Sequence, residues 1–166
     1  MKPKLFIMCG LSGSGKSSIA KDLAVKYHAE IVSSDAIREE LFGSCQNQSD
    51  NEKVFNIFNK RIRESLNKNK NVIADATNIT IKSRRAIVEY VRKLDVEKIC
   101  YIVPKKYKDC VKDNKNREHT VPEYVLEKQL RRFQIPLKKK DLVKLLFMIW
   151  DIHMLKKSFQ MQLRYQ

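Results

Sequence analysis

Short apolar runs and longer amphipathic segments alternate along the chain. The apolar runs are bounded by glycine and polar residues, and they predict buried strands. These predicted strands cover residues 4–9, 30–33, 71–75, 97–103 and 143–149. The amphipathic segments repeat their apolar positions every three to four residues, which predicts helices over 52–68, over 80–93, and from Pro122 to about residue 133. Alternating strands and helices are typical of an α/β domain with a parallel sheet.

The end of the chain has two interpretations. The run at 143–149 is continuously apolar, so it fits either a fifth strand or a buried helix. We take it as a strand followed by a terminal helix, the two together spanning about 142–164. A length of 166 residues without an internal repeat or linker fits one domain, residues 1–166. The expected architecture has three layers, with a central parallel sheet of four to five strands and helices on both faces.

Glycine is rare in this chain and is concentrated at one place. Three of the four glycines lie between residues 10 and 15, after the first predicted strand and before a helical pattern. The order strand, G-x-x-x-x-G-K-S, helix is the sequence context of a phosphate-binding P-loop. In such a loop, Lys16 reaches the β- and γ-phosphates and Ser17 binds Mg²⁺. The predicted nucleotide-binding residues of the loop are Gly10, Ser12, Gly13, Ser14, Gly15, Lys16, Ser17 and Ser18. We therefore expect a P-loop NTPase fold that uses ATP, or another NTP, and Mg²⁺.

Composition and charge limit the possible partners. The chain has 34 Lys and Arg against 19 Asp and Glu, a net charge of +15 at pH 7. Such an excess favours polyanions such as nucleic acid, although it also serves solubility alone. The apolar runs are too short to cross a bilayer, and the N-terminus lacks the pattern of a signal peptide. We expect a cytoplasmic protein, or one of the host cytoplasm if it is viral, with no membrane partner. The four cysteines form no C-x-x-C pair, which argues against a zinc module.

An acidic and a basic residue follow the second predicted strand, in the segment Ser34-Asp35-x-x-Arg38. Their spacing is one helical turn, so both side chains would face the same cleft. A carboxylate there can accept the proton of an attacking hydroxyl, and the arginine can hold a substrate phosphate or the charge that develops on the transferred group. The alternative is that Asp35 only caps a helix.

The third predicted strand ends in Asp75-Ala76-Thr77-Asn78. In a P-loop protein, a carboxylate after an apolar strand is placed to bind Mg²⁺, directly or through a water. An Asx-type turn with a helix cap explains the same tetrapeptide equally well.

Taken together, these motifs resemble those of the polynucleotide 5′-hydroxyl kinases of phage and bacterial RNA-repair systems. The resemblance covers roughly residues 4–136. It is carried by Gly10 to Ser18, Ser34-Asp35-x-x-Arg38, Asp75-Ala76-Thr77-Asn78, Arg84-Arg85, Asn114-Lys115-Asn116-Arg117 and Val121-Pro122-Glu123-Tyr124-Val125. Members of this family transfer the γ-phosphate of ATP to the 5′-OH of RNA or DNA, so the resemblance implies a nucleic acid with a 5′-OH end as substrate.

The resemblance also implies residue roles. Asp35 would be the general base, and Arg38 would contact the acceptor end of the nucleic acid. A helical lid at about 105–122 would close over the phosphates with Arg117. The implied catalytic residues are Lys16, Asp35, Arg38 and Arg117. The implied acceptor-binding residues are Asp35, Arg38, Asp75, Thr77, Asn78, Arg84 and Arg85. Metal binding would fall to Ser17 and Asp75.

The lid departs from the family pattern at one position. The family has Arg-Asn-x-x-Arg, whereas this chain has Asp113 in place of the first arginine, so an acid would stand near the triphosphate. This departure bears on closure over the nucleotide more than on the class of reaction. Two other functions also stay open, the first because it shares the P-loop architecture and the second because such a lid would not support turnover. One is a P-loop kinase of a small metabolite such as a nucleoside, sugar or antibiotic, and the other is a nucleotide-gated nucleic-acid-binding module without turnover. The sequence leaves open the oligomeric state and the preference between RNA and DNA.

Overall fold

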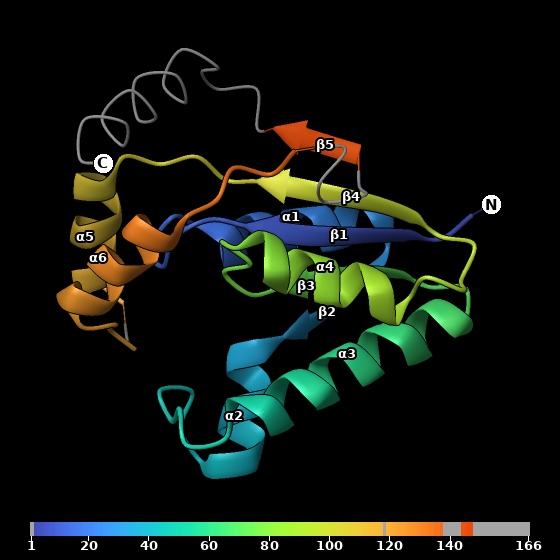
Figure 1. Cartoon of the computed structure of the whole chain (residues 1–166), viewed down its shortest axis with the longest axis horizontal. Helices are drawn as coiled ribbons and strands as arrows, with labels where there is room; N and C mark the ends of the chain where they lie inside the picture. Colours follow the sequence, from blue (N-terminus) through green and yellow to red (C-terminus); the bar gives the residue numbers. More distant parts are fainter. Residues whose placement is uncertain (1, 118, 138–143, 148–166) are drawn as a thin grey trace.

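The computed structural model describes residues 2–117, 119–137 and 144–147. Along this part of the chain each strand is followed by one or two helices before the next strand (Figure 1). The elements are β1 (Lys4–Cys9), α1 (Lys16–Tyr27), β2 (Ala29–Ser33), α2 (Ser34–Phe42), α3 (Asn51–Asn67), β3 (Asn71–Asp75), α4 (Ile81–Tyr90), β4 (Glu97–Ile102), α5 (Tyr107–Lys115), α6 (Glu123–Arg132) and β5 (Lys144–Phe147). No helix within the described ranges has the length and apolar character needed to span a membrane.

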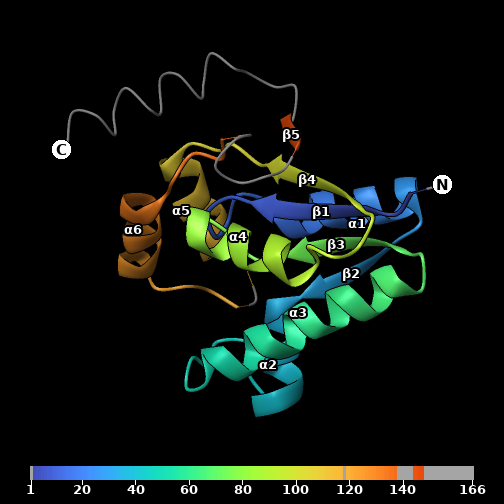
Figure 2. The ribbon, with the colours of Figure 1, turned by 45° about the vertical axis from the view of Figure 1, so that its right-hand side comes forward.

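The five strands form one parallel sheet in the order β2-β3-β1-β4-β5. β1 lies in the centre, with its P-loop end next to the ends of β3 and β4, and Figure 2 shows the same sheet from a second side. Since all strands run in one direction, their carboxyl ends share one edge of the sheet, where ligands bind in open α/β folds. The predicted parallel α/β architecture is confirmed.

Alternating side chains of β1 build the two halves of the core. Leu5 and Ile7 point to the face covered by α3 and α4, where they pack with residues such as Phe58. Phe6 and Met8 point to the opposite face and pack against α1. This two-residue period, with apolar side chains on both faces, is typical of a parallel strand buried between helical layers. It holds the P-loop end of β1 rigidly at the centre of the molecule.

The predicted elements agree with the observed ones to within a few residues. The helix predicted over 80–93 ends earlier, at Tyr90, and the strand predicted at 143–149 is present as β5 over Lys144–Phe147. That segment is therefore a strand and not the alternative buried helix. The helix predicted after it, up to about residue 164, lies outside the described residues.

Candidate active site

The P-loop turns tightly between β1 and α1. Gly13 and Gly15 have positive φ angles of 77° and 93°, in the region that only glycine adopts readily. A Cβ on Gly13 would also lie 2.3 Å from the carbonyl oxygen of Cys110. A hydrogen bond of 3.0 Å from the Gly10 N–H to the Thr77 carbonyl joins the P-loop to the loop after β3. Glycine is therefore required here both by backbone conformation and by the close approach of α5.

Lys16 begins α1 and is only 8% exposed. Its Nζ donates to the Leu11 carbonyl at 2.7 Å and approaches Ser14 Oγ at 3.5 Å. Burial lowers the pKa of Lys16 to about 8, and the negative field of Asp75 only partly opposes that effect. An ammonium has three N–H donors, so Lys16 keeps one for a phosphate oxygen. The negative charge of a bound phosphate would also stabilise the Lys16 ammonium, whose charged form burial disfavours.

Asp75 ends β3 beside the P-loop and is 9% exposed. Burial raises the pKa of its carboxyl group, while a hydrogen bond from Ser17 and the charge of Lys16 act in the opposite direction. The hydroxyl and the carboxylate thus lie in contact at the mouth of the loop. Oxygen donors of this kind are what Mg²⁺ prefers, so the residues present fit the ion that the P-loop implies.

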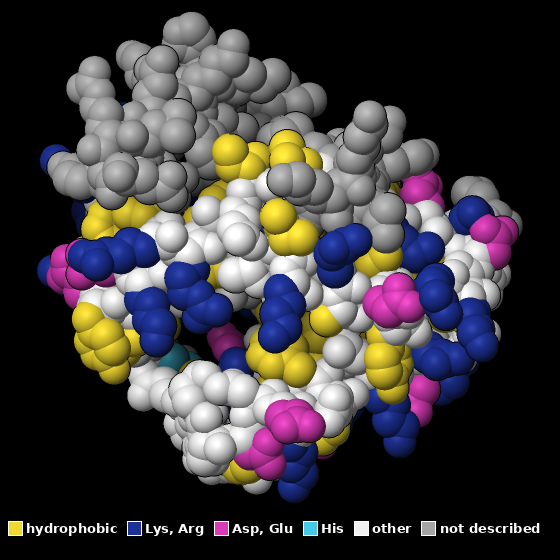
Figure 3. All heavy atoms as spheres, viewed as in Figure 1, with side chains coloured by type: hydrophobic (Ala, Val, Ile, Leu, Met, Phe, Trp, Pro, Cys, Tyr) yellow, Lys and Arg dark blue, Asp and Glu magenta, His cyan; other side chains and the backbone are white. Residues whose placement is uncertain are grey.

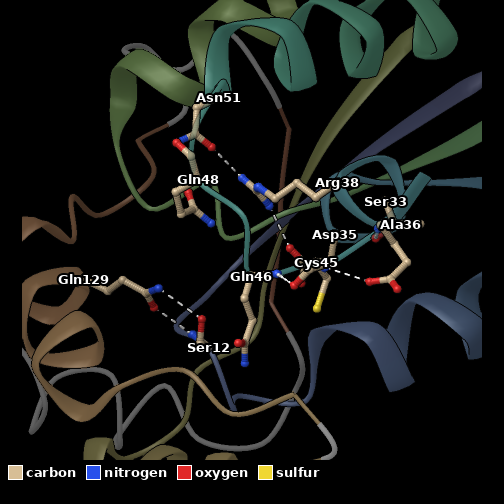
Figure 4. A network of polar contacts seen from close by, with 12 residues as sticks. Ser12, Ser33, Asp35, Ala36, Arg38, Cys45, Gln46, Gln48, Asn51 and Gln129 are labelled. Atoms are coloured by element: carbon tan, nitrogen blue, oxygen red, sulfur yellow. Dashed lines mark hydrogen bonds and ion pairs between the residues drawn. The ribbon is translucent and has the colours of Figure 1, made fainter. Parts of the chain in front are cut away.

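Asp35 and Arg38 form an ion pair at the end of β2. Arg38 Nη1 donates to Asp35 Oδ1 at 2.8 Å, and Arg38 Nη2 donates to Asn51 Oδ1 at 3.0 Å (Figure 4). The side chain of Arg38 is 8% exposed and that of Asp35 is 59% exposed, so the guanidinium is anchored while the carboxylate faces solvent. Arg38 Nε is buried and finds no hydrogen-bond partner among the described residues.

The cap of α2 is a different residue. Ser33 Oγ accepts a hydrogen bond from the Ala36 N–H at 3.3 Å, which is the geometry of an N-cap. The capping alternative for Asp35 is therefore wrong, and its carboxylate is available for chemistry. The Ser34-Asp35-x-x-Arg38 spacing did predict that Asp35 and Arg38 share one side of α2.

The side chains of Asn78 and Arg84 hold neighbouring segments of the fold together. Asn78, with φ of 45°, donates through Nδ2 to the Met8 carbonyl at 2.8 Å. Arg84 is fully buried and donates to the carbonyls of Asn78 at 2.8 Å and Gln134 at 2.9 Å. The expectation that Arg84 binds the acceptor is corrected here, because this guanidinium joins the loop after β3 to the segment after α6. Arg85 is exposed instead, and lines a surface pocket with Lys82.

The helices α5 and α6 lie over the P-loop. Gln129 of α6 accepts a hydrogen bond from the Ser12 N–H at 2.9 Å and donates to Ser12 Oγ at 3.0 Å (Figure 4). Buried Asn114 ties α5 to the following loop through two hydrogen bonds with Val121, of 2.7 and 3.0 Å. Sequence reasoning missed Gln129, because its partner lies 117 positions away and no local pattern marks it.

Asp113 is neutralised by a neighbour. It forms an ion pair with Lys105, which lowers the pKa of the Asp113 carboxyl group. Lys105 also donates to the Gly13 carbonyl at 3.3 Å, so the pair stands at the P-loop. Arg117 is exposed in the loop after α5. Its positive field adds to the burial that lowers the pKa of Lys16, and it partly opposes the burial that raises the pKa of Asp75. The structure thus brings Arg117 into electrostatic range of the phosphate site.

Comparison with known proteins relates these features to a family. A family model described as an AAA domain matches residues 5–136. No curated protein sequence matches the chain.

Many solved structures share the fold. A chain of the Pnkp1/Rnl/Hen1 RNA repair complex is 24% identical, with a TM-score of 0.68 over 77% of this chain and 43% of that one. Kti12 from Chaetomium thermophilum, solved with ADP-AlF3, is 15% identical, with a TM-score of 0.71 over 96% of this chain and 97% of that one. A gluconokinase from Sinorhizobium meliloti 1021 is 18% identical, with a TM-score of 0.59 over 98% and 93%. The similar part of the RNA repair chain is thus less than half of its length.

Proposed function

The chain belongs to the AAA domain family, here with the fold of the P-loop kinases, and on that premise we propose that it is an ATP-dependent polynucleotide 5′-kinase. It would transfer the γ-phosphate of ATP to the 5′-OH of RNA or DNA. The observation that carries the proposal is the Asp35–Arg38 pair, in which an exposed carboxylate is held by a buried guanidinium at the same sheet edge as the P-loop. Such a pair can activate a hydroxyl and hold an anionic acceptor at once.

The reaction is an in-line displacement at the γ-phosphorus. Asp35 accepts the proton of the 5′-OH as the new bond from O5′ to the γ-phosphorus forms. The bond from the γ-phosphorus to the bridging oxygen breaks, and ADP leaves with that oxygen. Lys16 binds the β- and γ-phosphate oxygens, and Arg117 adds positive charge over the transferred group. Ser17 and Asp75 would hold Mg²⁺, Asp75 directly or through a water, and the bound ion would neutralise charge on the phosphates.

Arg38 supports a phosphodiester acceptor. Hydrogen bonds to Asp35 and Asn51 fix the orientation of its guanidinium. The guanidinium Cζ lies over the ring of Phe55, 5.8 Å from the ring centroid. A fixed guanidinium is suited to a phosphate oxygen of the terminal nucleotide. The net charge of +15 acts in the same direction, and Lys and Arg side chains are spread over the face of Figure 3. The likeness to a chain of an RNA repair complex agrees with this acceptor.

A second candidate is a kinase of a small metabolite. It is favoured by the likeness to the gluconokinase, which extends over nearly the whole of both chains. The two functions differ in how salt affects the acceptor. Binding of an oligonucleotide weakens steeply as salt rises because counterions are released, whereas binding of an uncharged sugar changes little.

The test is transfer of labelled γ-phosphate from ATP and Mg²⁺ to 5′-OH RNA and DNA oligonucleotides, beside a panel of nucleosides and sugars, at two salt concentrations. We expect label at the oligonucleotide 5′ end, lost steeply at the higher salt. Label on a small molecule alone would replace the proposal by the metabolite kinase. ATP binding without any transfer would favour a nucleotide-gated binding module.

The role of Asp35 is tested in the same assay. Asp35→Asn should lower kcat by about 10²- to 10⁴-fold, the usual contribution of a general base, and leave ATP affinity unchanged. The matched control is Asp22→Asn, which removes an exposed carboxylate from α1. A variant at position 35 that turns over as fast as Asp22→Asn would show that Asp35 is not the base.

A further inference from the structure

Three metal-binding types of side chain meet at the edge of the candidate active site. Glu39 lies on α2, Cys45 lies in the loop that follows α2, and His119 lies in the loop between α5 and α6. One carboxylate oxygen, the Sγ and one ring nitrogen all lie within 4.8 Å of one another. The nucleotide and acceptor chemistry described above uses none of these three side chains.

We propose that Glu39, Cys45 and His119 form a binding site for Zn²⁺ that is separate from the Mg²⁺ site of the P-loop. Thiolate, imidazole and carboxylate are the three ligand types of protein-bound zinc, and a thiolate disfavours Mg²⁺. Around a tetrahedral Zn²⁺, ligand atoms 2.0–2.3 Å from the ion lie about 3.5 Å from one another. The observed separations, at most 4.8 Å, therefore need to close by about 1.3 Å at most, which rotation of the exposed Glu39 and His119 side chains can supply. The fourth position would be taken by water.

Hydrogen bonds already hold the three segments together. The Cys45 N–H donates to one carboxylate oxygen of Glu39 at 2.7 Å, which leaves the other oxygen for a metal. Gln46 Nε2 donates to the Thr120 carbonyl at 2.8 Å, so the residues after Cys45 and His119 are joined directly. Figure 4 shows Cys45 and Gln46 beside Asp35. The loop after α2 is thus hydrogen-bonded both to α2 and to the loop between α5 and α6, which keeps the three side chains close together.

Within the described ranges, the other cysteines and the other histidine are poorly placed to form such a site. All four cysteines lie in the described ranges, and Cys9, Cys100 and Cys110 are buried, whereas Cys45 is partly exposed. His28 is the C-cap of α1 and does not belong to the cluster. The spacing of these residues along the chain predicted no zinc module, because the three ligands come from segments that only the fold brings together.

Zinc at this junction would connect two functional elements. Glu39 lies one helical turn after Asp35 on α2. His119 follows Arg117 by two residues in the loop between α5 and α6, which we call the lid loop. An ion bound to both would fix the loop of Arg117 relative to the helix of Asp35.

The test is a Zn²⁺ titration of the protein without an affinity tag, in competition with a chromophoric chelator. Excess Mg²⁺ is present to fill oxygen-only sites, and no nucleotide or acceptor is added, so the result does not depend on the proposed kinase activity. We expect one ion per chain. Cys45→Ala, His119→Asn and Glu39→Gln should each raise the Kd by more than about tenfold, since loss even of a partner behind a ligand costs at least that much. His28→Asn is the matched control and should bind as the parent does.

A second measurement keeps the proposal testable if a variant folds poorly. Co²⁺ bound to the parent protein should show the near-ultraviolet thiolate-to-cobalt absorption band, and alkylation of Cys45 should remove it. Glu39→Gln retains an acceptor for the Cys45 N–H, so it separates loss of a ligand from loss of the loop. The proposal is overturned if the parent fails to compete with the chelator, if the three variants bind Zn²⁺ like His28→Asn, or if the Co²⁺ complex lacks the band.

Discussion

Replacing Lys16 by methionine should stabilise the folded protein while it removes nucleotide binding. Lys16 is buried, and burial lowers its pKa from 10.5 to about 8. At about 1.4 kcal/mol for each pKa unit, keeping this ammonium charged at pH 7 costs the folded state about 3 kcal/mol. Methionine has a similar length and no charge, but it loses the hydrogen bond to the Leu11 carbonyl, worth about 1 kcal/mol. The expected net gain is about 2 kcal/mol, or a Tm higher by about 4–8 °C.

The dependence on pH gives the sign of the effect. Between pH 8 and 10.5 the unfolded chain keeps the proton of Lys16 while the folded chain releases it, so the wild-type protein gains stability as pH rises through this window. Lys16→Met has no such group. The advantage of the variant should therefore be full near pH 7, shrink above pH 8, and reverse once the wild-type amine is neutral in both states and keeps its hydrogen bond.

Urea denaturation of both proteins at a series of pH values measures this difference directly. Lys21→Met, an exposed position on the same helix, is the control and should change the free energy of unfolding by no more than about 0.5 kcal/mol. Added ATP should raise the Tm of the wild-type protein and of the control, but not that of Lys16→Met. The reasoning is refuted if Lys16→Met is less stable than the wild type at pH 7, or if the difference between them does not change with pH.

Two further substitutions test the surroundings of the P-loop. Asp113→Asn breaks the ion pair with Lys105 and frees the Lys105 ammonium beside Gly13. Calorimetry should then show ATP binding up to about fivefold tighter at low salt. Weaker ATP binding would contradict this role of the ion pair. Arg84→Met leaves the carbonyls of Asn78 and Gln134 without their charged donor and should cost about 3 kcal/mol in urea denaturation, against about 0.5 kcal/mol or less for the exposed Arg85→Met. Equal effects at the two positions would refute the structural assignment of Arg84.

The sequence predicted the sheet and the loop because both depend on local patterns. A strand buried on both faces must be apolar, as β1 is from Leu5 to Cys9. A P-loop must place glycine where φ is positive, as at Gly13 and Gly15. The different places of Arg84 and Arg85, one buried and the other exposed, were not predicted, although the sequence of α4 indicates them. Arg84 lies three and four residues before Ile87 and Val88, on the apolar stripe of α4, so helical period alone would have turned it inward.

Contacts between distant segments could not be predicted in this way. Gln129 and Ser12 are joined only because α6 lies over the P-loop, and Glu39, Cys45 and His119 meet only because the lid loop reaches the loop after α2. No period or spacing encodes such meetings, since each depends on how complete elements pack. The candidate site was therefore predictable where single strands end, and unpredictable where α5 and α6 cover it.

The contact of Gln129 changes how the P-loop must work. The Ser12 N–H belongs to the set of backbone donors that a P-loop offers to phosphate, yet it donates to Gln129 Oε1. Lys105 likewise reaches the loop through the Gly13 carbonyl while it neutralises Asp113. Both α6 and the segment before α5 thus hold the loop backbone from the lid side. A triphosphate that uses the Ser12 N–H must displace Gln129, and binding of the nucleotide is therefore coupled to the position of α6.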